Sequence, residues 1–210
     1  MFHGMSKKAL WVSLLVAGLY APAAVYAGGP PPLPDVMDQS VISGDALSHV
    51  HGIVNVNLAA GSGNAQANAT AIAEGVGGTT AHTGITQSSS SAGGVSGSAM
   101  AHIGGQAFSN ASGLISVNQA SGVGNTQANG IAVALGIGGK VVTDNTLAGT
   151  LSNAGGLDDK HDGPSGSRDA SVGDNAFAGA HGIIQVNQSA GSGNVTANSF
   201  ALNVNLGAKP

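Results

Sequence analysis

Apolar and polar residues alternate with a period of two in three well-separated parts of the chain. Residues 52–57, 113–118 and 182–187 align with one another without a gap. A period of two is that of a β-strand, because successive side chains of a strand point to opposite faces. The alignment therefore predicts three equivalent strands, each with one dry, apolar face and one face of amides or hydroxyls. The apolar faces carry Val54, Val56, Ile115, Val117, Ile184 and Val186, and the polar faces carry Asn55, Asn57, Ser116, Asn118, Gln185 and Asn187.

Each of these strands runs into a Gly-x-Gly-Asn turn and then into a second alternating segment. In the first copy, residues 65–72 place alanine at every other position, with Gln, Asn, Thr or Ile between. Paired glycines supply the positive φ angles that a tight reversal needs. The small alanines permit a second sheet to approach closely. The turn glycines are Gly61, Gly63, Gly122, Gly124, Gly191 and Gly193.

A hairpin and a β-arch could both use this turn. The strands of a hairpin hydrogen-bond to each other, whereas those of an arch face each other through their side chains. We favour the arch, because hairpins would give identical repeats no reason to stack in register. Stacked at about 4.7 Å per layer, equivalent amides hydrogen-bond to the layers above and below. The predicted ladders are Asn57, Asn118 and Asn187; Asn64, Asn125 and Asn194; and Asn68, Asn129 and Asn198.

The repeats divide the chain into units. Each copy spans about 33 residues, and Leu47, Phe108 and Phe177 occupy matching places before the first strands. Prolines are expected to keep the lead-in out of any ladder, and the polar, turn-rich linkers to be flexible, solvated loops. The expected units are a signal peptide (1–27), a proline-rich lead-in (28–43), repeat 1 (44–77), linker 1 (78–104), repeat 2 (105–137), linker 2 (138–172) and repeat 3 (173–210).

The first 27 residues have the pattern of an export signal. Lys7 and Lys8 precede an apolar stretch, residues 9–19, and small residues continue to Ala27. The apolar stretch is shorter than the span of about 20 residues that crosses a bilayer, so no stable membrane anchor is expected. Removal of the signal leaves four basic and ten acidic residues, a net charge of −6. The remaining basic residues are scattered, which argues against nucleic acid as a partner.

Composition rules out an ordinary globular core. The chain has 35 glycines, 3% aromatic and 8% charged residues, and no cysteine that could form a disulfide. Large apolar side chains therefore cannot supply most of the stability, and repeated backbone ladders are the expected source. The sequence predicts an all-β protein in which three stacked β-arches form a β-solenoid or cross-β amyloid core.

No set of residues suggests catalysis or a bound cofactor. An active site needs acids, bases or nucleophiles that converge in a pocket, and the pattern offers none. His49 and His51 could place two imidazoles on one strand face for zinc, and His181 matches His51 in the third copy. Ser112 interrupts that column, so strand-edge packing or exposure is favoured. We predict neither an enzyme nor a metal or cofactor site.

The repeated pattern resembles that of a known family. The motif Asn-x-x-x-Gly-x-Gly-Asn-x-x-Ala-Asn occurs at 57–68, 118–129 and 187–198. It is similar to the repeats of the Fap functional amyloid fibrillins (FapB/FapC-like subunits) of biofilm-forming bacteria, which also have a signal peptide, three repeats and two linkers. More weakly, it resembles curlin. The chain lacks the Cys-x-x-Cys pair of some family members, which leaves open whether it is the bulk or the nucleating subunit.

The resemblance implies a secreted, extracellular protein that passes the periplasm and an outer-membrane export pore. It also implies self-assembly into cell-surface fibres with other fibre subunits, where the fibres stiffen biofilms and promote attachment. The alternative reading is a monomeric β-solenoid that serves as a surface adhesin or binding module, because a closed solenoid would show the same repeats.

Overall fold

The computed structural model describes residues 36–205 apart from 77, 93–96, 138–139 and 153–165. The expected signal peptide lies outside the described residues. The described chain forms strands and turns without a helix, so it holds no helix that could span a membrane. Its strands are β1 (Val36–Ile42), β2 (His51–Ala60), β3 (Ala65–Val76), β4 (Thr80–Ala92), β5 (Gly97–Ile103), β6 (Ser112–Val123), β7 (Thr126–Ile137), β8 (Lys140–Ser152), β9 (Arg168–Val172), β10 (His181–Ser192) and β11 (Val195–Asn205).

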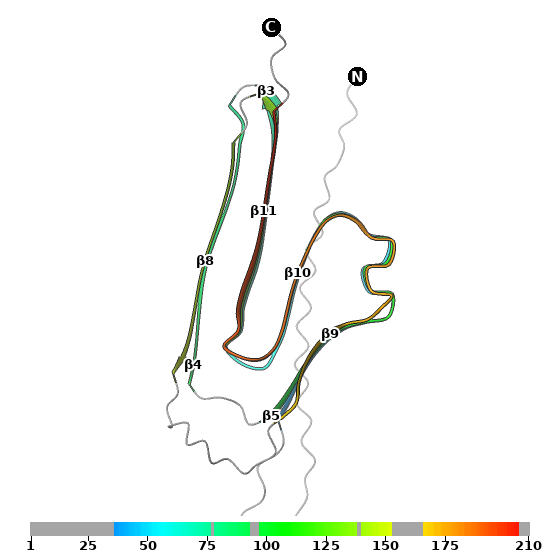
Figure 1. Cartoon of the computed structure of the whole chain (residues 1–210), viewed down its shortest axis with the longest axis vertical. Coiled ribbons are helices and arrows are strands. Elements are labelled where there is room, and N and C mark those ends of the chain that lie inside the picture. The colour runs from blue at the N-terminus through cyan, green and yellow to red at the C-terminus, as the bar shows by residue number, and fades with distance from the viewer. Residues whose placement is uncertain (1–35, 77, 93–96, 138–139, 153–165, 206–210) are drawn as a thin grey trace, which may run out of the picture.

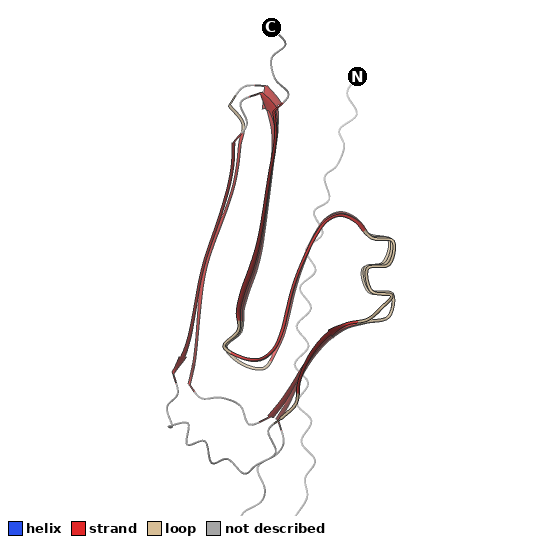
Figure 2. Ribbon diagram, viewed as in Figure 1, coloured by secondary structure: helices blue, strands red, loops and turns tan. Residues whose placement is uncertain are grey.

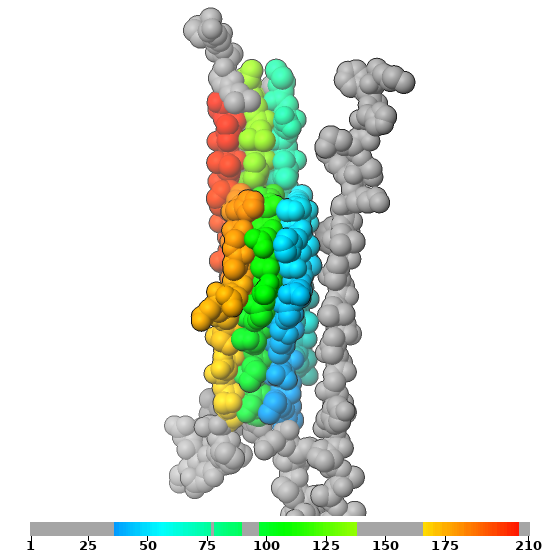
Figure 3. All heavy atoms as spheres, turned by 90° about the vertical axis from the view of Figure 1, so that its right-hand side faces the viewer, coloured from blue at the N-terminus to red at the C-terminus, as the bar shows by residue number. Residues whose placement is uncertain are grey.

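The strands form three layers that stack on one another. β1 to β4 make the first layer, β5 to β8 the second, and β9 to β11 the third. Equivalent strands pair in parallel, in the orders β1-β5-β9, β2-β6-β10, β3-β7-β11 and β4-β8. Viewed along the stack, the layers overlie one another almost completely (Figure 1). Seen from the side, the second layer lies between the other two (Figure 3). The all-β, stacked β-solenoid fold expected from the repeats is therefore confirmed.

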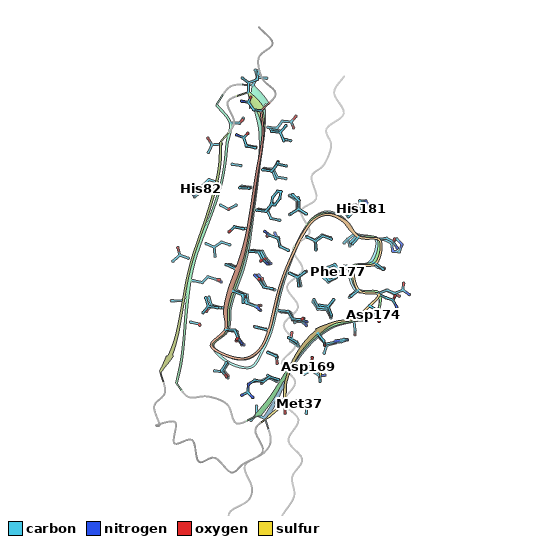
Figure 4. All side chains as sticks on the ribbon, in the orientation of Figure 1. Met37, His82, Asp169, Asp174, Phe177 and His181 are labelled. Carbon is cyan, nitrogen blue, oxygen red and sulfur yellow. The ribbon has the colours of Figure 1, made fainter. Side chains whose placement is uncertain are left out.

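Within a layer the chain folds back on itself without pairing to itself. β2 and β3 flank the Gly-x-Gly-Asn turn but belong to different sheets, as do β6 and β7. The two strands of a layer run side by side from the turn (Figure 2), and their side chains lie between them (Figure 4), whereas their backbones bond to the neighbouring layers. This is the geometry of a β-arch, and the hairpin alternative is excluded.

A small apolar core lies between the first two strand columns and the turn that joins them. Ile115 and Val117 of β6 are fully buried, and they pack with Ile103 of β5 and with Phe108 of the turn. Val54 and Val56 in the first layer, and Ile184 and Val186 in the third, are only partly buried. The second layer is dry because it is covered on both sides.

The turn before each first strand contains bulky residues with left-handed backbone angles. Leu47, Phe108 and Phe177 have φ of 58°, 59° and 62° at equivalent positions. This conformation costs about 1–2 kcal/mol for an L-residue. Stacking holds it in place: the Phe177 amide donates to the Ala107 carbonyl at 2.8 Å, and the rings of Phe108 and Phe177 stack with centroids 4.7 Å apart.

A two-stranded sheet, β4-β8, covers the outer face of β3-β7-β11. β4 packs against both β3 and β7, and β8 against both β7 and β11. The smaller sheet is thus displaced by half a layer relative to the larger one. Alanines make the contact and allow the close approach that the sequence predicted. They are Ala71, Ala73, Ala81, Ala132 and Ala134.

The expectation that both linkers are flexible loops is wrong for their described parts. Residues 78–104 contain β4 and β5, and residues 138–172 contain β8 and β9. In β4 the residues Ala81, Thr83 and Ile85 are buried, whereas the residues between them are exposed. The period of two is present, but small and hydroxyl side chains hide it from a reading based on hydrophobicity.

The lead-in also differs from expectation at its end. Residues 28–43 were expected to stay out of any ladder, yet β1 within them pairs along its whole length with β5. All of the prolines in this stretch come before Val36, so every residue of β1 keeps its amide donor.

Candidate functional site

Two columns of asparagine fill the interior of the arches. Asn57, Asn118 and Asn187 project from β2, β6 and β10, and Asn68, Asn129 and Asn198 project towards them from β3, β7 and β11. Strand alternation directs these side chains inward, because the opposite faces of the same strands pack on the apolar core or on β4-β8. The arch interior is therefore lined by amides rather than by the apolar side chains.

Each asparagine column is a continuous hydrogen-bonded ladder. Asn118 Nδ2 donates to Asn57 Oδ1 at 3.0 Å, and Asn187 Nδ2 donates to Asn118 Oδ1 at 3.0 Å. In the facing column, Asn129 donates to Asn68 at 2.9 Å and Asn198 donates to Asn129 at 3.0 Å. In both columns the donor belongs to the later layer, so the ladders have a direction.

The two columns also bond to each other across the arch. Asn129 Nδ2 donates to Asn118 Oδ1 at 2.9 Å, and Asn118 Nδ2 donates to Asn68 Oδ1 at 3.0 Å. The same amides cap backbone carbonyls of the facing strand, as when Asn118 donates to Ala67 O at 2.8 Å. The three layers and both sides of the arch are thereby joined in one network.

A third ladder lies in the Gly-x-Gly-Asn turns. Asn125 Nδ2 donates to Asn64 Oδ1 at 2.9 Å, and Asn194 Nδ2 donates to Asn125 Oδ1 at 2.8 Å. Asn125 also donates to the Gly191 carbonyl at 3.0 Å. This third set of amides fixes the bend of the chain in every layer.

The middle member of every ladder is fully enclosed. Asn118, Asn125 and Asn129 are 0% exposed, and each has amide partners in both neighbouring layers. A buried amide without partners costs about 1–3 kcal/mol, so such residues require a layer above and a layer below. In the outer layers, Asn57 is exposed and Asn198 is half-buried, whereas Asn187 stays buried. The outer layers therefore present amides of the same kind on open faces.

The neighbouring polar column does not form a ladder. Asn55, Ser116 and Gln185 share a register position, but Asn55 Oδ1, Ser116 Oγ and Gln185 Oε1 lack hydrogen-bond partners in the described structure. Their side chains differ in length, so equivalent atoms do not meet from layer to layer. Identity along the column, and not polarity alone, produces a ladder.

Two glutamine contacts were not singled out in the sequence. Gln66 Nε2 donates to Gln127 Oε1 at 2.8 Å, and Gln188 Nε2 donates to Gln119 Oε1 at 2.8 Å. The repeat alignment could have found both, because each pair stands at one aligned position. Thr196 and Leu58 replace the third glutamine in these columns, which limits each contact to two layers.

The turn glycines have the positive φ angles that the sequence predicted, from 66° at Gly63 to 120° at Gly191. Close stacking adds a second constraint. A Cβ on Gly122 would lie 2.0 Å from the carbonyl oxygen of Gly191 in the next layer. A further glycine column, Gly52, Gly113 and Gly182, is equally tight: a Cβ on Gly113 would lie 2.1 Å from Gly52 O. The alignment contained this column, but periodicity gave no reason to select it.

His51 and His181 lie in the two outer layers of the stack. His51 shares a hydrogen bond with the Ser112 hydroxyl, and His181 contacts the Gly179 carbonyl. His181 lies on the outside of the bend that leads into β10 (Figure 4). Within the described residues, no three His, Cys, Asp or Glu side chains come together as a metal site would require.

The comparison with protein families decides what kind of protein carries this network. The model of the functional amyloid protein FapB/FapC family matches residues 23–205. The chain belongs to the FapB/FapC family. No solved structure matches it. The match spans all three asparagine ladders and the strands β4, β5, β8 and β9 between the repeats.

The network explains how the layers of a FapB/FapC protein can hold together. Its groups are amides and backbone carbonyls that do not titrate, and they bond both to equivalent groups in adjacent layers and to the facing strand of the arch. Such a network holds identical layers together, which is the property that defines an amyloid protein.

Proposed function

We propose that this protein is a secreted, self-assembling subunit of extracellular functional amyloid fibres, with a structural role in the biofilm matrix and in surface attachment. Family membership supports the amyloid function. Secretion through the periplasm and an outer-membrane pore, and the presence of other fibre subunits, follow from the same resemblance and from the signal pattern in residues 1–27.

One observation carries the self-assembly: the asparagine ladders and the parallel pairing of the arch strands repeat in every layer, and the stack has no cap at either end of its described part. β2 and β3 pair on one side only, as do β10 and β11 on the opposite face. These edges expose rows of backbone donors and acceptors, which recruit another strand unless they are covered. A further copy of the chain offers the matching edge, so polymerisation continues the fold.

Exposed apolar side chains have the same distribution. In the described chain, every exposed large apolar residue except Met100 belongs to the first or the third layer. Ile72 is 52% exposed in the first layer and Leu202 is 38% exposed in the third, and both share a register position with Val133. Stacking a second copy would bury these side chains as Val133 is buried now.

Fibre formation by purified residues 28–210 tests the proposal. Quiescent incubation should give thioflavin-positive, detergent-resistant fibres with a reflection near 4.7 Å along the fibre axis. A chain that stays a soluble monomer at high concentration would instead favour the alternative function, a monomeric β-solenoid adhesin.

A further inference from the structure

The first strand column holds two opposite charges at one position in different layers. Asp38, Ala99 and Arg168 are register partners in β1, β5 and β9. Both charged side chains point inward to the same part of the turn. Asp38 Oδ2 lies 2.7 Å from the place where a Cβ on Gly61 would be, and Arg168 Cδ lies 3.0 Å from the corresponding place on Gly191. The carboxylate and the guanidinium therefore occupy equivalent sites on the two open faces.

Within one chain these charges do not meet. Ala99 stands between them and is 5% exposed, so the two backbones are separated by two layers, or about 9.5 Å. Arg168 Nη1 donates to the Gly166 carbonyl at 2.8 Å. Partial burial raises the pKa of Asp38, because desolvation disfavours the charged carboxylate. Among the described residues, neither charge has an ion-pair partner.

We propose that the next copy in the fibre places its Asp38 directly against Arg168, and that this ion pair across each joint selects the partner face and sets its register. The inference rests on the proposed function, since it requires the third layer of one copy to stack on the first layer of another. Continuing the observed register by one layer reduces the backbone separation of the two residues to about 4.8 Å. An arginine and an aspartate so placed can form a charge-assisted hydrogen bond.

The remaining charges of the two faces fit the same joint. When the register is continued into the joint, each other described carboxylate of these two faces comes opposite an uncharged residue. Asp169 lies opposite Gln39, Asp174 opposite Gly44, Asp45 opposite Asn175, and Glu74 opposite Val204. No carboxylate of one face therefore shares a register position with a carboxylate of the other, and Arg168 shares its position with Asp38. A joint displaced along the strands would lose this complementarity.

Charge reversal and charge exchange test the joint. Asp38→Arg and Arg168→Asp should each slow fibre elongation at least tenfold at low ionic strength, and the double exchange should recover most of the wild-type rate. Asp169→Arg is the matched control, because it makes the same change of charge in a column that holds no Arg or Asp partner. The inference would be overturned if the two reversals slow elongation no more than this control does and the double exchange does not recover the rate.

A direct contact measurement on wild-type fibres does not depend on the behaviour of variants. Arg168 is the only arginine in the chain, so ¹⁵N-arginine labels a single guanidinium. Fibres grown from a mixture of ¹⁵N-arginine chains and ¹³C-aspartate chains should show a nitrogen–carbon contact of about 4 Å, as an ion pair requires. The contact should vanish when the ¹³C chains carry Asp38→Asn.

The two levels of the proposal fail differently. Fibres that lack the Arg168–Asp38 contact would overturn the inference and leave the proposed function intact. Absence of fibres would overturn both.

Discussion

At the scale of the residue, the fold depends on side chains that meet their own kind. A hydrogen bond between amides contributes only about 1 kcal/mol net, whereas a buried amide that loses its partners costs about 1–3 kcal/mol. The second layer is the most sensitive place, because Asn118 and Asn129 are fully buried and bonded on both sides. Glycine matters for a different reason, since the layers are too close for a Cβ at Gly122.

Replacing Asn118 by aspartate should break the arch interior. The substitution removes the Nδ2 group that donates to Asn57, Ala67 and Asn68, and it places a carboxylate oxygen against these three acceptors in a fully buried site. Leaving a buried charge without compensation costs about 3–5 kcal/mol. Fibres of the variant should dissolve at a markedly lower guanidinium concentration than the wild type. Asn205→Asp, the same change at an exposed position of β11, is the control, and equal effects of the two would contradict the ladder.

Gly122→Ala should prevent the third layer from docking on the second. Its methyl group would overlap Gly191 O, and Gly122 has a φ of 109° that alanine adopts only under strain. The expected result is a long delay in thioflavin signal and loss of hydrogen-exchange protection in β10. Gly78→Ala is a suitable comparison, because φ is also positive there but no atom lies within 4 Å of the added methyl. Similar kinetics for both variants would argue against steric exclusion between layers.

At the scale of the element, the sequence predicted the strands whose columns are chemically uniform. The six strands of the arches were found because Val, Ile and Asn recur at aligned positions. β4 and β5 were missed because Ala, Ser or Thr occupies most of their described buried positions, for example Ala81 and Thr83. The burial of β4 is set by the β3-β7-β11 sheet, whose alanines accept small side chains, and this information lies in tertiary contact rather than in local hydrophobicity.

β4 should therefore behave as part of the ordered stack. Ala81→Asp places a carboxylate against Ala132 and Ala134, where the site is 2% exposed. His82→Asp makes its change one residue away on the opposite, exposed face, where His82 points away from β3 (Figure 4). Hydrogen exchange of β4 and β8 amides should rise in the first variant and stay unchanged in the second. Rapid hydrogen exchange of β4 in the wild-type fibre would instead support the sequence-based prediction that this segment is a flexible loop.

At the scale of the whole molecule, one chain supplies three layers of the stack. This arrangement differs from an amyloid in which each chain contributes a single layer. Three layers of about 4.7 Å correspond to one chain per roughly 14 Å of fibre. The repeat number could be predicted from the sequence, because three copies align. The half-layer displacement of β4-β8 could not, because it results from how two sheets of different strand number pack.

Mass per length distinguishes the two arrangements. For the 20.1 kDa chain, a single filament should contain about 1.4 kDa per Å, measured by scanning transmission electron microscopy of unstained fibres. A chain without residues 1–27 should give a proportionally smaller value. A result about three times higher for a single filament would mean that each chain fills one layer, which would contradict the stacked arches.

The left-handed residues in the turns have a consequence for the timing of assembly. In an isolated layer, Leu47 or its equivalent Phe108 or Phe177 must adopt a left-handed backbone conformation that the free chain seldom visits. No neighbouring layer is yet present to stabilise it. A layer that forms on an existing stack meets a template with that conformation already in place. Starting a stack is therefore intrinsically slower than extending one, so unseeded solutions should show a lag that preformed fragments abolish.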